Sequence, residues 1–133
     1  MMVQRFMEGA AIVLGAAALA LIFAPEHALA SLDIAPMPPA STLAQLYGAA
    51  LLGLATTAWF ARTMLLGGIY GKAVVAGGFA HALVGAFALL HVMRTTSGNV
   101  LVWGACVVYV ALSIGFGALM FGRGPKAPAS SAP

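Results

Sequence analysis

The chain has 133 residues, of which 62% are hydrophobic and only 7% are charged. Soluble globular domains contain about 25% charged residues, so this composition lacks the charge to cover a surface in water. It excludes an ordinary cytosolic enzyme and a disordered regulator, and a net charge of +3 is too small for a nucleic-acid-binding face. The composition therefore favours a small membrane protein with a single domain.

Four apolar stretches are long enough to cross a bilayer as helices, which takes about 20 residues each. They predict spans at about residues 6–24, 43–61, 73–93 and 100–121. Because the apolar runs are continuous rather than alternating, they favour helices over a β-barrel. The predicted fold is therefore all-α, an integral membrane four-helix antiparallel bundle over residues 1–123. The remaining residues, 124–133, are small residues and prolines with one lysine, and they predict a disordered cytoplasmic tail.

Prolines and glycines mark the expected connections. Pro25 ends the first span, and three further prolines predict an irregular segment until Ser41 and Thr42 cap the second helix. Glycines at positions 67, 68 and 71 predict a loop before the third span. Ser97-Gly98-Asn99 predicts a tight turn before the fourth span.

The first span has a second interpretation. Arg5, the apolar run to Ala24 and the Ala28-Leu29-Ala30 triplet resemble a cleavable secretory signal. Glu8 is unusual in a basic leader, and the apolar run is long for such a signal, which favours a retained helix. The sequence leaves open whether the first span is retained or cleaved at Ala30, and the other spans keep their orientation in either case.

Basic residues predict the orientation of the spans. Only Arg94 falls on the side that also carries Glu26 and Asp33. The other five lie on the opposite side, and they are Arg5, Arg62, Lys72, Arg123 and Lys126. Because an excess of positive charge marks the cytoplasmic side, both termini are expected in the cytoplasm and the protein in the bacterial inner membrane.

Small residues predict how the helices pack, because close approach replaces the hydrophobic effect inside lipid. Small residues that repeat along one face of a helix form a stripe, which can pack against a helix of the same chain or of another subunit. A homo-oligomer and a larger membrane complex therefore both remain open. The expected stripes are Ala11-Gly15-Leu19, Ala49-Gly53-Thr57, Gly78-Ala82-Gly85-Leu89 and Gly104-Ala111-Gly115-Ala118-Gly122, one for each span in order.

His81 is the leading candidate for a functional residue, because an ionisable side chain at bilayer depth is costly. It follows Lys72 by about 13 Å of helix, which places it near the midplane. It is a candidate ligand for haem or chlorin, a quinone-binding residue or a proton relay. The alternative is a neutral imidazole bonded to a hydroxyl or carbonyl of a neighbouring helix. The alternative is favoured because His91 lies about 15 Å further along the same helix, so the two cannot share one metal.

The remaining polar residues carry weaker expectations. Glu8 and Arg62 are expected at one headgroup level, where solvated headgroup contact is favoured over an ion pair. Cys106, in an apolar run, is expected to be inert. No defined metal site, catalytic residue or bound cofactor is predicted.

Several motifs between Tyr47 and His91 resemble a group of small uncharacterised bacterial four-helix inner-membrane proteins, a domain of unknown function. They are Trp59-Phe60-Ala61-Arg62, the G-G-I-Y-G-K run at residues 67–72, and the G-x-x-x-H-x-x-x-G-A pattern around His81. Members of the group have Asn where this chain has Gly78, which removes a polar neighbour of His81. The resemblance implies a four-span membrane fold and no known activity.

The glycine-rich run also suggests where a contact surface lies. Its glycines permit positive φ angles and predict a short cytoplasmic loop that brings Arg62, Tyr70 and Lys72 together at the headgroup level. These three residues are candidate contacts for a lipid headgroup or a partner protein.

Three functions follow, in order of preference. The first is a non-enzymatic structural or accessory component of the membrane. The second is a binder of haem, chlorin or quinone that uses His81. The third is a small transporter or channel subunit, for which the spans offer little polar lining. The expected partners are the lipid bilayer and membrane subunits, and no nucleic acid.

Overall fold

The computed structural model describes residues 2–63, 69–95 and 99–122. All regular secondary structure in these ranges is helical, in five helices: α1 (Met2–Phe23), α2 (Pro25–Ser31), α3 (Pro38–Ala61), α4 (Ile69–Thr95) and α5 (Val100–Phe121). All of these except the short α2 are long and apolar enough to cross a membrane. The tail expected at 124–133 lies outside the described residues, as do Gly67, Gly68, Ser97 and Gly98 of the expected connections.

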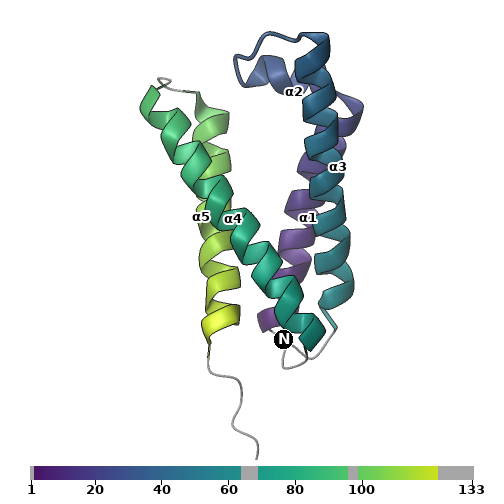
Figure 1. Ribbon diagram of the computed structural model, residues 1–133, viewed down its shortest axis with the longest axis vertical. Helices are drawn as coiled ribbons and strands as arrows, with labels where there is room; N and C mark the ends of the chain where they lie inside the picture. Colours follow the sequence, from purple (N-terminus) through teal and green to yellow (C-terminus); the bar gives the residue numbers. More distant parts are fainter. Residues whose placement is uncertain (1, 64–68, 96–98, 123–133) are drawn as a thin grey trace, which may run out of the picture.

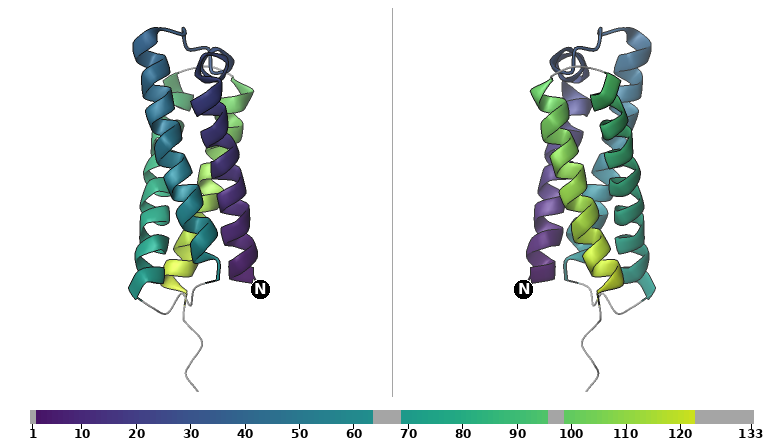
Figure 2. Two further views of the ribbon diagram at one scale, coloured as in Figure 1. Left: turned by 90° about the vertical axis from the view of Figure 1, so that its right-hand side faces the viewer. Right: turned by 90° about the vertical axis from the view of Figure 1, so that its left-hand side faces the viewer.

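The long helices are arranged as two pairs (Figure 1). α1 packs along α3, and α4 packs along α5, whereas contacts between the pairs are much fewer. Figure 1 shows the pairs close together at the end where the N-terminus lies and further apart at the other end. We call these the narrow end and the wide end. The short α2 runs across the wide end, where it is seen end-on in Figure 2 and contacts α1 and α3.

The connection between α1 and α3 differs from the expected irregular segment. Pro25 follows the end of α1 and also begins α2, because the first turn of a helix does not need the N–H that proline lacks. α3 begins at Pro38 and has no side-chain cap. The expected cap by Ser41 and Thr42 is therefore wrong, and the Thr42 hydroxyl donates to the Pro38 carbonyl at 2.9 Å within the first turn.

Three long helices, α1, α3 and α4, begin earlier than expected, whereas α5 has the predicted bounds. α4 begins at Ile69, so Tyr70 and Lys72 lie in its first turn rather than in a loop. A single glycine costs a helix only about 1 kcal/mol relative to alanine, so Gly71 does not end it. α1 begins at Met2, which places Glu8 in its second turn rather than at its N-terminus.

Alanine and glycine line the contact between α1 and α3. The buried positions follow a spacing of three and four residues, which places them on one face of each helix. At Gly48 an added Cβ would lie 3.0 Å from the carbonyl oxygen of Ala18, so the two backbones approach each other directly. The buried residues are Met7, Ala10, Ala11, Leu14 and Ala18 of α1, and Ala44, Gly48, Leu51, Ala55, Ala58 and Ala61 of α3.

The stripe expected on α3 is therefore wrong, and the stripe expected on α1 is partly wrong. Ala49, Gly53 and Thr57 are exposed, because α3 turns the neighbouring stripe of small residues toward α1. In α1, Ala11 is buried as expected, but Leu19 is exposed.

The stripe expected on α4 is confirmed as a packing face, but aromatic rings fill the space beside its glycines. Gly78 faces Phe116, and Gly85 faces Tyr109, both of α5. α5 thus contributes large side chains to this contact. Its expected small-residue stripe is wrong at Gly104, Ala111, Ala118 and Gly122, which are exposed. The remaining member, Gly115, faces the ring of Phe6.

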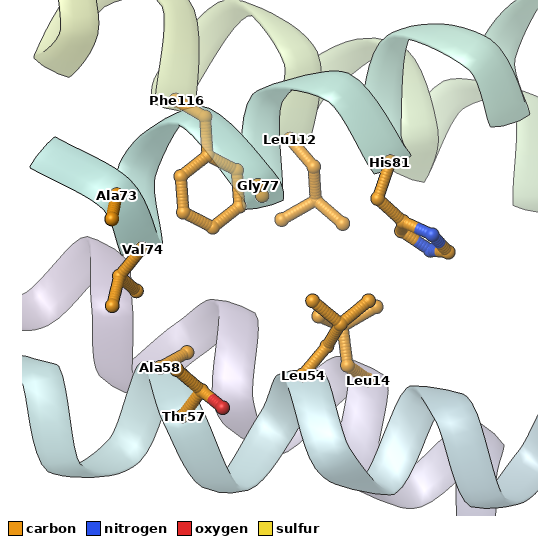
Figure 3. A pocket seen from close by; sticks show the side chains of 11 residues that line it. Leu14, Leu54, Thr57, Ala58, Ala73, Val74, Gly77, His81, Leu112 and Phe116 are labelled. Atoms are coloured by element: carbon orange, nitrogen blue, oxygen red, sulfur yellow. The ribbon is translucent and has the colours of Figure 1, made fainter.

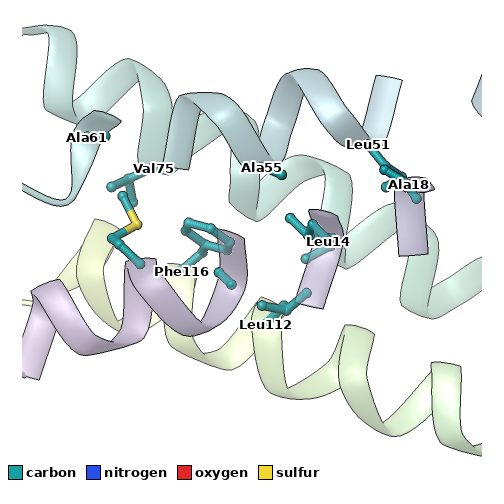
Figure 4. Packing of buried hydrophobic residues seen from close by; sticks show 11 residues of the cluster. Leu14, Ala18, Leu51, Ala55, Ala61, Val75, Leu112 and Phe116 are labelled. Carbon is teal, nitrogen blue, oxygen red and sulfur yellow. The ribbon is translucent and has the colours of Figure 1, made fainter. Parts of the chain in front are cut away.

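The two pairs share a core toward the narrow end (Figure 4). Phe116 and Leu112 of α5 lie there with Val75 of α4 and Leu14 of α1. Phe6 of α1 meets Phe116 edge to face, with ring centroids 5.1 Å apart. These side chains join the pairs where the helices are closest.

Candidate functional site

Three polar side chains from three helices meet between the pairs. The hydroxyls of Tyr47 of α3 and Tyr109 of α5 are hydrogen-bonded. The Tyr109 hydroxyl also lies 3.2 Å from Nε2 of His81 on α4. The His81 ring is stacked on Tyr47 at a centroid distance of 6.3 Å and lies 5.5 Å from the ring of Tyr109. His81 thus has the neighbouring-helix hydroxyl partner that the sequence favoured, and the cluster connects the two pairs.

Gly85 positions Tyr109 in this cluster. It follows His81 by one turn of α4, and an added Cβ would overlap the Tyr109 ring. The ring therefore lies directly against the α4 backbone, with its hydroxyl beside the His81 imidazole. The two tyrosines were sequence candidates for bonds between helices, but no sequence pattern identifies them as partners of His81.

A cavity of about 310 Å³ lies beside His81, between the two pairs (Figure 3). Its walls are mainly apolar, and Figure 3 shows Leu14 and Leu54 across the cavity from the His81 ring. Thr57 is the other lining residue with a polar side chain, and its hydroxyl donates to the Gly53 carbonyl at 2.7 Å within α3. His81 is therefore the side chain best placed to bond a guest in this cavity.

The arrangement of His81 is poorly suited to haem or chlorin ligation. A metal bound at Nε2 would displace the Tyr109 hydroxyl, so a ligand has access only to Nδ1, to which no described residue is hydrogen-bonded. Over the described ranges, no group of three or more His, Cys, Asp and Glu side chains could hold a metal ion. The cavity and cluster instead fit a neutral guest that accepts or donates a hydrogen bond.

A second set of polar contacts lies at the narrow end. Nε of Arg62, at the end of α3, lies 3.7 Å from Oε1 of Glu8 on α1. Glu8 also accepts a bond from Gln4 at 3.2 Å, and the Arg62 guanidinium lies 3.6 Å from the centroid of the Trp59 ring. The ion pair is therefore present, where the sequence favoured solvated headgroup contact, because the longer α1 brings Glu8 level with the end of α3.

Arg62 is not joined to the other two headgroup candidates by the described contacts. Tyr70 is 82% exposed, and Lys72 is exposed beside it in the first turn of α4. In residues 2–63 and 69–95, no hydrogen bond, ion pair or ring contact links either of them to Arg62. A shared headgroup contact of the three residues stays a prediction.

The sequence missed a link at the wide end. Nδ2 of Asn99 donates to Oδ2 of Asp33 at 2.7 Å and to the Ser31 carbonyl at 2.9 Å. Its Oδ1 accepts a bond from the N–H of Leu101 and so caps α5. Asparagine directly before an apolar run is a typical cap signal and could have revealed the cap, although nothing in the sequence indicates the partners across the loops.

Comparisons with protein-family models, with curated proteins and with solved structures give no match to this chain. The resemblance to small four-helix inner-membrane proteins therefore stays an expectation from the quoted motifs.

Proposed function

We propose that the chain is a small multi-pass protein of the bacterial inner membrane, in which α1, α3, α4 and α5 form an antiparallel four-helix bundle. Its proposed role is that of a non-enzymatic structural or accessory component. The observation that carries this proposal is the distribution of side chains: large apolar groups face outward, and the polar groups of Tyr47, His81 and Tyr109 bond one another between the helices.

The outward apolar groups support insertion in lipid. Ile12 is 63% exposed, Phe60 66% and Ile114 68%, and each lies on a different long helix. In water, a continuous apolar surface of this kind promotes aggregation, whereas hydrocarbon solvates it without cost. The hydrogen bonds between Tyr47, Tyr109 and His81 satisfy polar groups that lipid cannot solvate.

The positions of the charges support an orientation with both termini in the cytoplasm. Arg5, Arg62 and Lys72 lie toward the narrow end, at the start of α1, the end of α3 and the start of α4. Arg94 lies in the last turn of α4, toward the wide end, which also carries Glu26 of α2. By the positive-inside tendency, the narrow end faces the cytoplasm.

Exposed glycines support an accessory role. An added Cβ at Gly53 of α3 or at Gly104 of α5 would meet nothing within 4 Å. A helix from another subunit could approach closely at such positions, because no side chain separates the backbones. Both a second copy of this chain and a different membrane protein fit this surface, which makes a homo-oligomer or a larger complex the proposed state.

Native mass spectrometry of the detergent-extracted full chain tests the proposal. We expect the protein to need detergent for extraction and to be detected as an oligomer or with a bound membrane protein. The variant Gly104→Leu should reduce that assembly, and Gly9→Leu serves as a control of equal size at another open position. Recovery without detergent would contradict membrane insertion, and a bare monomer in mild detergent would contradict the accessory role.

A further inference from the structure

We propose that the cavity between the two helix pairs binds one neutral, lipid-soluble ring compound of the quinone class, with Nδ1 of His81 hydrogen-bonded to a ring oxygen. This inference rests on the proposed membrane location, because such a guest enters from the hydrocarbon phase. It adds a ligand-binding site to a role that is otherwise structural.

The size of the cavity matches one substituted ring. An apolar cavity of about 150 Å³ in a protein interior binds benzene. The volume here is about 310 Å³, which gives room for a ring with its substituents and the first part of a tail. This volume is also at the lower limit of ordinary small-molecule pockets, which start at about 300 Å³.

The chemistry of the walls selects a neutral guest. None of the residues that line the cavity is acidic, and none is Lys or Arg. A fatty-acid carboxylate or a phospholipid phosphate would be buried there without a cation, at a cost that the apolar contacts do not offset. The walls, including Phe116 and Leu112, instead offer apolar contact to a flat ring.

The polar cluster lets His81 bond either an oxygen acceptor or a hydroxyl. A neutral imidazole has one donor and one acceptor nitrogen, and the Tyr109 hydroxyl at Nε2 can serve as either partner. When Tyr109 accepts from Nε2, Nδ1 accepts from a quinol hydroxyl. When Tyr109 donates to Nε2, Nδ1 donates to a quinone oxygen. The hydroxyl of Tyr47 bonds Tyr109 in both arrangements.

The cavity has an entrance on the outside of the protein. Thr57 of α3 and Ala73 and Gly77 of α4 line the cavity and are also exposed, so it opens between these two helices. An added Cβ at Gly77 would meet nothing within 4 Å. A leucine at this position therefore obstructs the entrance without disturbing the packing of α4.

The test uses the full chain in nanodiscs of phosphatidylethanolamine and phosphatidylglycerol. A decyl-substituted benzoquinone is titrated into these nanodiscs, and calorimetry measures the heat of binding. We expect saturable binding of one quinone per chain. His81→Phe should weaken it about fivefold, the effect of one net hydrogen bond. Gly77→Leu should abolish it, whereas Gly9→Leu, at an equally open position that does not line the cavity, should bind as the wild type does.

Three results would overturn the inference: no saturable binding by the wild type, unchanged binding by Gly77→Leu, or equal affinity for decylbenzene, which has no ring oxygens. Fractionation of the same cells separates this from failure of the proposed function. A membrane-embedded protein that binds no quinone overturns the site alone, and a protein found in the aqueous fraction overturns the membrane role itself.

Discussion

Gly85 determines where the ring of Tyr109 lies. The ring occupies the space that any side chain at position 85 would need, and its hydroxyl is held by Tyr47 and His81. The ring therefore cannot move aside without losing interhelical hydrogen bonds, which average about 0.6 kcal/mol each in membrane proteins. The absence of a side chain at Gly85 thus allows the hydrogen-bond cluster that joins α3, α4 and α5 in the described residues.

We expect Gly85→Ala to destabilise the protein by about 1–3 kcal/mol, the usual cost of overpacking. Gly77→Ala is the matched control, because its Cβ meets nothing and alanine favours a helix by about 0.5–1 kcal/mol over glycine. Unfolding of both variants in mixed detergent micelles measures the difference. A Gly85→Ala variant as stable as Gly77→Ala would show that Tyr109 moves freely.

His81 could be predicted from the sequence, but its partners could not. An imidazole at mid-membrane depth is conspicuous in any apolar run. The candidate hydroxyls lie on α3 and α5, and their chemistry alone does not show which of them bonds His81. The threonine hydroxyls of Thr56 and Thr57 bond carbonyls of their own helix, one turn earlier. The longer tyrosine side chains cross between helices, and their register depends on tertiary packing.

The faces of the long helices were harder to predict than their existence. Length and hydropathy suffice for the four spans. However, a helix in lipid is apolar on all sides, so the hydrophobic pattern does not reveal which side is buried. α3 carries two parallel stripes of small residues, and the one that includes Gly48 packs while the one that includes Gly53 is exposed. The short α2 was missed because Pro25 was interpreted only as the end of a helix.

Asn99 caps α5 and also bonds Ser31 and Asp33 at the wide end. Two replacements of Asn99 separate the effect of the cap from the effect of these bonds. Asn99→Ala removes both the cap of α5 and the bonds to Ser31 and Asp33, so we expect a loss of about 2 kcal/mol. Asn99→Ser keeps a capping oxygen and loses only the amide donor, so about half of that loss is expected. Hydrogen exchange at the first turn of α5 and the free energy of unfolding measure the two effects. An Asn99→Ser variant as stable as the wild type would contradict a link between the loops.

At the scale of the whole molecule, different interactions hold the helices together at the narrow end and at the wide end. Toward the narrow end, apolar rings such as Phe6 and Phe116 pack between the pairs, and the ion pair of Glu8 and Arg62 joins α1 to α3. At the wide end, the amide of Asn99 bonds the segment that follows α2. Phe116 also lines the cavity, which therefore lies against the rings packed toward the narrow end and opens between α3 and α4.

The charges of the whole chain, rather than any single contact, should fix its orientation. Replacing Arg5, Arg62 and Lys72 by Gln lowers the basic residues of the proposed cytoplasmic side from five to two, against one on the other side. Gln at position 62 removes a partly exposed ion pair of 3.7 Å, which contributes little to stability, so the fold should be preserved. A fluorescent protein fused after Pro133 reports a cytoplasmic C-terminus, and alkaline phosphatase fused there reports a C-terminus on the opposite side. We expect full fluorescence from the wild type. The triple variant should lose about half of that fluorescence, and its phosphatase fusion should gain activity. Arg94→Gln, the matched control, should keep full fluorescence because it removes the opposing charge. Undiminished fluorescence in the triple variant would show that something other than the basic residues sets the orientation.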